Sequence, residues 1–229
     1  MPDAGATRPG PTRVLVVEDE PLFREMLCGY LAGQRSIQVI GSVDNGHDAL
    51  RIAGAESPDV VLVDIELGSQ PDGIRTAHMI KAANPATGIV ILTTHTDREY
   101  LAAIPDKKAA GWSFLLKESV PDGHALVRAV EGAAWGLVSI DPALVQGLRP
   151  QRWSTLERLT QLQWQVLSSM AAGKSDAAIA RQHRKSDIEL ERLLKTIYDD
   201  LHIGAGESMD QRVKAVLTFL RETSARPTA

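Results

Sequence analysis

Side chains that could do chemistry follow or end four apolar runs in the first half of the chain. The runs cover residues 14–17, 60–63, 89–92 and 112–116. The side chains at their ends are Glu18, Asp19, Asp64, Thr93 and Lys117. Three carboxylates that lie together repel one another unless a cation binds between them, and hard oxygen ligands with room for water favour Mg²⁺. With a lysine ammonium and a threonine hydroxyl beside them, the set predicts phosphoryl transfer, with Asp64 as the nucleophile and Lys117 paired with phosphoryl oxygens.

Each of these residues also has an ordinary interpretation. A carboxylate at the end of a strand is usually a solvated loop residue, and a single lysine is usually a surface side chain. A common site is favoured because suitable groups recur at successive strand ends. The run before Asp64 is apolar throughout, which is typical of a strand buried on both faces.

The apolar runs alternate with segments of helical periodicity, which predicts βαβ units. Strands are expected at 14–17, 37–43, 60–64, 89–94 and 112–116, and helices at about 21–32, 46–53, 74–83, 97–110 and 120–135. This order predicts an α/β fold, a doubly wound five-stranded parallel sheet. Right-handed crossovers bring the carboxyl ends of all its strands to one edge, where ligand sites collect.

Residues 13 to about 130 resemble the receiver domain of a two-component response regulator. The resemblance is carried by Val17-Glu18-Asp19-Glu20-Pro21, Val63-Asp64-Ile65-Glu66-Leu67, Thr93 and Phe114-Leu115-Leu116-Lys117. It implies that a sensor histidine kinase phosphorylates Asp64. It also implies a set of Mg²⁺ ligands, namely Glu18 (through water), Asp19, Asp64 and the main-chain carbonyl of Glu66.

The resemblance further implies a switch. Thr93 would move toward the phosphoryl group and Phe114 would turn inward, although Phe114 alone is also a plain core residue. Two positions depart from the family pattern. Thr94 stands where receivers more often carry Ala or Gly, and Pro105 would shorten or kink the helix expected at 97–110.

From Leu156 onward the apolar periodicity is helical only, and Ser175 and Ser186 are expected N-caps. Four short helices, with a tight turn at 183–185 between the second and third, are compatible with a helix-turn-helix. Residues 159 to about 220 resemble the LuxR-type DNA-binding domain of the NarL/FixJ class, mostly at framework positions. Those positions are Leu159-Thr160, Val166-Leu167, Ala171, Gly173, Ser175, Ile179-Ala180, Ser186, Leu194, Ile197 and Leu201.

The third helix of this domain would be the recognition helix in the major groove of DNA. Its expected outward set is net acidic and comprises Glu191, Arg192, Lys195, Asp199 and Asp200. Affinity for DNA comes largely from basic groups that neutralise phosphates, so this composition disfavours binding. The expected DNA contacts, each of which could equally be a solvated surface residue, are Arg181, Arg184, Lys185, Glu191, Arg192 and Lys195.

Three functions therefore stay open, and none of them is enzymatic. In the first, phosphorylation favours a homodimer that binds a two-fold DNA site and controls transcription. In the second, the switch is kept but the output is a protein-interaction or dimerisation module that has lost DNA binding. In the third, the receiver holds its output domain shut without phosphate.

Changes in composition, and segments that contain proline or glycine, divide the 229-residue chain into domains and connecting segments. We expect a flexible tail at 1–12, a receiver at 13–135, a linker at 136–154, an output domain at 155–222 and a tail at 223–229. Residues 1–130 contain 12 basic and 17 acidic residues and the remainder 13 and 12, so charge gives nucleic-acid binding weak support at most.

The same composition predicts a cytoplasmic protein. No apolar run approaches the roughly 20 residues of a membrane span, and no signal-peptide pattern opens the chain, so we expect no membrane association. The single cysteine, Cys28, rules out an internal disulfide and fits a reducing compartment.

Overall fold

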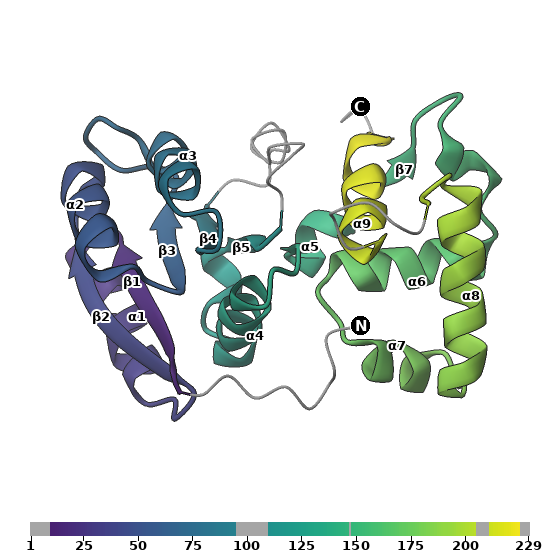
Figure 1. The fold of residues 1–229 in the computed structure, drawn as a ribbon, viewed down its shortest axis with the longest axis horizontal. Coiled ribbons are helices and arrows are strands. Elements are labelled where there is room, and N and C mark those ends of the chain that lie inside the picture. The colour runs from purple at the N-terminus through teal and green to yellow at the C-terminus, as the bar shows by residue number, and fades with distance from the viewer. Residues whose placement is uncertain (1–9, 95–109, 147, 205–210, 225–229) are drawn as a thin grey trace.

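The computed structural model describes residues 10–94, 110–146, 148–204 and 211–224. Figure 1 shows two parts, a sheet flanked by helices and a group of helices formed by the last third of the chain. The helix expected at 97–110, with its Pro105, lies outside the described residues except for Ala110. In the described ranges no helix is long and apolar enough to cross a membrane.

Six strands form a parallel sheet in the order β2-β1-β3-β4-β5-β6. They are β1 (Thr12–Val17), β2 (Ile37–Val43), β3 (Val60–Asp64), β4 (Gly88–Thr93), β5 (Trp112–Leu116) and β6 (Ser139–Ile140). The strands β3, β4 and β5 are buried along their whole length, as their continuous apolar sequences predict. The doubly wound α/β sheet is thus confirmed.

The five expected receiver strands are confirmed, and a sixth strand, β6, comes from residues that were assigned to the linker. A strand of two residues is too short to show alternation in its sequence. Strand β5 would otherwise present an unpaired edge, and β6 satisfies part of that edge.

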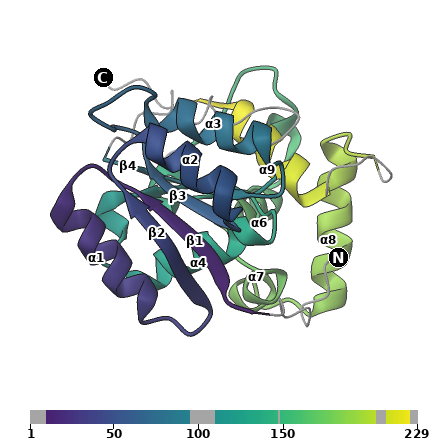
Figure 2. The ribbon, with the colours of Figure 1, turned by 60° about the vertical axis from the view of Figure 1, so that its left-hand side comes forward.

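Within the described residues, helices pack against both faces of the sheet (Figure 2). The helices of this part are α1 (Pro21–Ala32), α2 (Gly46–Glu56), α3 (Gly73–Ala83) and α4 (Gly123–Ala134). Ala49 of α2 and Ile80 of α3 pack in one core cluster, while Leu27 of α1 and Leu126 of α4 pack in the other. Alternate strand residues supply the two clusters, as expected for a sheet buried on both sides.

Helix α1 begins at Pro21, where the missing N–H of proline costs nothing. Its predicted apolar stripe is only half buried, and this corrects the expectation from its periodicity. Leu27 and Leu31 are buried, whereas Leu22, Met26 and Tyr30 are 77%, 42% and 37% exposed. The sheet covers only part of this apolar stripe, because the stripe is wider than the face of α1 that packs on the sheet.

The second part contains four helices within the described residues. They are α6 (Gln161–Ala171), α7 (Asp176–Gln182), α8 (Asp187–Asp200) and α9 (Gln211–Arg221). The predicted N-caps are confirmed, because the Ser175 hydroxyl accepts from the N–H of Ala178 and the Ser186 hydroxyl accepts from the N–H of Glu189. The pair α7–α8 is the expected helix-turn-helix.

The described parts of the expected linker, and residues 223–224 of the expected tail, form short regular elements. The expected linker contains a short helix, α5 (Pro142–Val145). Strand β7 (Arg149–Pro150) pairs antiparallel with β8 (Thr223–Ser224), which corrects the assignment of 223–224 to a tail. The Glu222 carboxylate accepts from both the N–H and the hydroxyl of Thr155 and so fastens this junction.

Candidate functional site

Four of the predicted site residues meet at the carboxyl edge of the sheet, and the fifth lies at the end of the next strand. Asp64 ends β3, Glu18 directly follows β1 and Lys117 directly follows β5. Thr93 ends β4, where it is buried. The strand ends are level, because Asp64 pairs with Leu92 of β4 and Thr93 pairs with Leu116 of β5.

The Lys117 ammonium joins the two buried carboxylates of this edge. Its Nζ lies 2.9 Å from Oε1 of Glu18 and 3.0 Å from Oδ2 of Asp64. The ammonium also lies 4.8 Å from the centre of the Phe23 ring, a cation–π contact. Burial by itself would lower the pKa of Lys117, but the hydrogen bonds to Glu18 and Asp64 outweigh it and raise this pKa. Lys117 is therefore held as a cation between two acids.

Glu18 and Asp64 have more acceptor atoms than the protein fills. Glu18 is 0% exposed and Asp64 is 2% exposed, and burial raises the pKa of Glu18 despite its hydrogen bond from Lys117. Oε2 of Glu18 and Oδ1 of Asp64 are buried and accept no hydrogen bond from any residue that the structure describes. One oxygen from each of Glu18, Asp19 and Asp64 lies within 4.8 Å of the others. This arrangement fits a hard divalent cation, because such an ion takes several carboxylate oxygens and water.

The loop after β3 completes the pocket. Oδ2 of Asp19 accepts from the N–H of Gly68 in this loop at 3.0 Å. Gly73 at the start of α3 lies against the strand end, because a Cβ there would be 1.7 Å from the carbonyl oxygen of Asp64. Arg24 of α1 donates to the carbonyl of Glu18 at 2.6 Å. Sequence reasoning missed Gly73 and Arg24, since neither carries a recognisable spacing relative to the acids.

Comparison with known proteins places this pocket in a family. The sequence profile of the response regulator receiver domain matches residues 14–141, more than half of the chain. The chain belongs to the response regulators. The transcriptional regulators of this family are not enzymes.

Two relatives match most of this response regulator. It is 31% identical over 179 residues to the uncharacterized transcriptional regulatory protein YxjL of Bacillus subtilis strain 168, covering 74% of this chain and 80% of that protein. It is 29% identical over 215 residues to the probable transcriptional regulatory protein NarL of Mycobacterium tuberculosis strain H37Rv, covering 90% and 97%. A solved structure of two RcsB dimers bound to two parallel DNAs shares the fold, with a TM-score of 0.54 at 19% identity over 93% of this chain and 99% of that one.

Phe114, the residue expected to turn inward on phosphorylation, lies within β5 of this response regulator. Phe114 is already buried in β5, at 2% exposed, and its backbone pairs with Ile140 of β6. The Thr94 hydroxyl, at the departure noted above, donates to Oε2 of Glu66 at 3.3 Å.

The predicted DNA-contacting residues lie on or beside the helix-turn-helix. Arg181, Arg184, Glu191, Arg192 and Lys195 are exposed. Lys185 is half-buried, and its Nζ lies 3.8 Å from Oε1 of Glu189 on the next turn of chain. Ile188, near the start of α8, is 63% exposed and was not among the expected contacts.

The expected outward set of α8 needs one correction. Asp200 is half-buried, and its Oδ2 accepts from Nε2 of Gln163 on α6 at 2.6 Å. It therefore fastens α8 to α6 and does not face outward. Without it, the exposed set of Glu191, Arg192, Lys195 and Asp199 carries as many bases as acids. The repulsion of DNA expected from this helix is correspondingly weaker.

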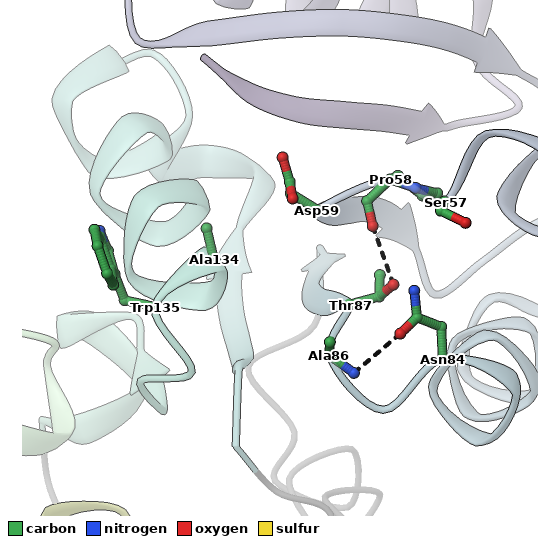
Figure 3. Close-up of a pocket in the computed structure, with 8 residues that line it drawn as sticks. All are labelled: Ser57, Pro58, Asp59, Asn84, Ala86, Thr87, Ala134 and Trp135. Carbon is green, nitrogen blue, oxygen red and sulfur yellow. Dashed lines mark hydrogen bonds between the residues drawn. The ribbon is translucent and has the colours of Figure 1, made fainter. Parts of the chain in front are cut away.

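A shallow hollow of about 270 Å³ lies at the opposite edge of the sheet from the acidic pocket (Figure 3). It lies between the turns before β3 and β4 and the end of α4. Its polar groups bond one another, since the Thr87 hydroxyl donates to the Pro58 carbonyl and the N–H of Ala86 donates to Asn84. These hydrogen bonds stabilise the turns, and the hollow offers a ligand few polar groups to bind.

Proposed function

We propose that this response regulator accepts a phosphoryl group on Asp64 from a sensor histidine kinase and controls transcription through its helix-turn-helix part. The observation that carries the proposal is the pocket in which Lys117 bridges Glu18 and Asp64 while one oxygen of each acid has no hydrogen-bond partner among the described residues. A reducing compartment, the cytoplasm, suits the free thiol of Cys28, whose pKa is raised by burial.

The chemistry required of the chain is one displacement at phosphorus. A carboxylate oxygen of Asp64 attacks the phosphorus of a phosphohistidine, the P–N bond breaks, and its electron pair stays on the imidazole nitrogen. Lys117 pairs with the phosphoryl oxygens, and the Thr93 hydroxyl lies one strand away. Glu18, Asp19, Asp64 and the carbonyl of Glu66 would hold a Mg²⁺, which would supply positive charge for the transferred group.

The exposed stripe of α1 suits a partner helix. Leu22, Met26 and Tyr30 recur at intervals of four residues and face solvent, and α1 begins three residues after Glu18. An apolar face of this kind packs well against a helix of a partner protein. A kinase that docks here places its phosphohistidine beside the pocket.

The DNA partner is supported by the exposed basic residues on both sides of the turn, Arg181, Arg184, Arg192 and Lys195. The alternative output, a protein-interaction or dimerisation module, is supported by the balanced charge of the outward face of α8. A homodimer is expected on activation in either case, because two recognition helices bind a two-fold site more tightly than one.

A gel shift of the full chain on a random-sequence duplex pool, over a salt series, tests the proposal. We expect binding that strengthens with beryllofluoride and Mg²⁺ and weakens steeply with salt, since phosphate contacts release counterions. Arg192→Ala should remove one phosphate contact and so reduce the slope of log affinity against log salt concentration by about one. Asp64→Asn, the matched control, should remove the response to beryllofluoride.

Absence of salt-dependent binding under all these conditions contradicts the DNA output. If Glu191→Lys then binds while the native chain does not, the acidic side chain in the N-terminal half of α8 is the cause, and the interaction module is the better function.

A further inference from the structure

The strand β6 connects the phosphorylation pocket to the output part. Ser139 pairs with Ser113, and their hydroxyls are 2.8 Å apart. Ile140 pairs with Phe114, and the N–H of Asp141 donates to the Phe114 carbonyl at 2.8 Å. The end of β5 is thus bonded to residues that lead directly into the second part of the molecule.

The side chain of Asp141 extends this contact beyond the last strand pair. Its Oδ2 accepts from the N–H of Leu116 at 3.1 Å, and its Oδ1 accepts from the N–H of Ala143 at the start of α5. The residue is 3% exposed and takes part in none of the ion pairs found among the described residues. A buried N–H without a partner costs free energy, so Leu116 depends on this carboxylate.

Leu116 directly precedes the lysine of the pocket. The direction in which Lys117 leaves the sheet is set by the backbone of Leu116, and its ammonium must reach Asp64 at 3.0 Å. If the backbone of Leu116 shifts and the Lys117 ammonium moves away from Asp64, the charge pair weakens. Both the hydrogen bond and the Coulomb attraction fall with distance.

The output part rests on the same strand. Gly173, just after α6, has φ +73°, and a Cβ built there would lie 2.8 Å from Cβ of Ser139. Ile140 and Leu144 share one core cluster with Met170 of α6. Figure 1 shows α5 between β5 and α6, so the two parts meet through the segment that contains Asp141.

We propose that Asp141 is a positioning residue of the phosphorylation site. By accepting a hydrogen bond from the N–H of Leu116, Asp141 fixes the backbone from which Lys117 reaches Asp64. Through β6 it also couples the phosphorylation site to the contact between Ser139 and Gly173. Such coupling is reciprocal, so displacement of the output part weakens the pocket as well. Because the pocket must accept a phosphoryl group for this to matter, the inference rests on the proposed function.

Beryllofluoride with Mg²⁺, titrated into the full chain, tests this role. Asp141→Ala should weaken binding roughly tenfold, the factor expected for the loss of one hydrogen bond to a charged group. The affinity of Asp141→Asn should lie between those of the native chain and Asp141→Ala, because an amide oxygen can accept from one N–H while its NH₂ group repels the other. The thermal midpoint without ligand is measured beside it, since a merely structural role lowers that midpoint and leaves the affinity of the folded protein unchanged.

Two glycines of the output part provide the second arm. Gly173→Ala should weaken beryllofluoride binding several-fold, although it lies in the other part of the molecule. Gly204→Ala, where no atom lies within 4 Å of the new Cβ, should leave it unchanged. The double variant with Asp141→Ala should lose little more than Asp141→Ala alone, because both act through β6.

Unchanged affinity in a folded Asp141→Ala chain overturns the positioning role. Additive losses in the double variant overturn the coupling to Gly173. Failure of the native chain to bind beryllofluoride contradicts the proposed function itself, and is thereby told apart from a failure of the inference.

Discussion

At the scale of the residue, the pocket depends on charged groups that are kept out of water. Two buried acids share one lysine, so the set carries net negative charge in an environment that disfavours it. The types and strand-end positions of these residues could be predicted from the sequence, because apolar strands make polar ends conspicuous. The sharing of Lys117 could not be predicted, since it depends on side-chain reach across neighbouring strands.

A second buried lysine gives a prediction about stability. Lys81 is 3% exposed, and its Nζ donates to the carbonyls of Thr87 and Ala110. Burial lowers its pKa to about 8. Between pH 8 and the higher pKa of the unfolded chain, the unfolded state binds more protons, so this group makes stability rise with pH.

The free energy of unfolding of the native chain, relative to Lys81→Met, should therefore rise by roughly 2 to 3 kcal/mol from pH 7 to pH 10. Urea denaturation at several pH values measures it. Lys174→Met, at an exposed lysine, should show no such trend relative to the native chain. If the difference in the free energy of unfolding between the native chain and Lys81→Met stays constant or falls as pH rises, the lowered pKa of Lys81 is contradicted.

At the scale of the element, the start of α3 shapes the pocket as much as any strand does. The Asp72 carboxylate accepts from the N–H of Arg75 and caps the helix, and Gly73 lets the helix approach the carbonyl of Asp64. Sequence predicted the helix and its bounds, because cap and periodicity are local. It could not predict the close approach, which is a contact between elements.

Gly73→Ala should destabilise the chain by at least about 2 kcal/mol and should also weaken metal-dependent phosphorylation, because α3 must move away from the end of β3. Gly54→Ala, at an exposed site in α2 with no atom within 4 Å, is the matched control and should stabilise by roughly 0.5–1 kcal/mol. Denaturant unfolding of both variants measures the difference. Equal effects at the two glycines would show that the contact with Asp64 is not restrictive.

At the scale of the whole molecule, one hydrophobic core cluster runs from the sheet into the helices of the output part. The fold of each part could be predicted, since the periodicity changes from alternating strand and helix to helix alone near Leu156. The junction could not, because β6, β7 and β8 have two residues each and their pairing is decided by distant partners. Both parts are therefore joined where the sequence looked most like a loose linker.

The most direct measurement is the location of the phosphoryl group after incubation with acetyl phosphate and Mg²⁺. Intact-mass analysis followed by borohydride reduction and peptide mapping identifies an acyl phosphate. We predict one added phosphoryl group, carried by Asp64 and lost in Asp64→Asn. No added mass with metal present, or a phosphoryl group on another residue, would contradict the function assigned to this pocket.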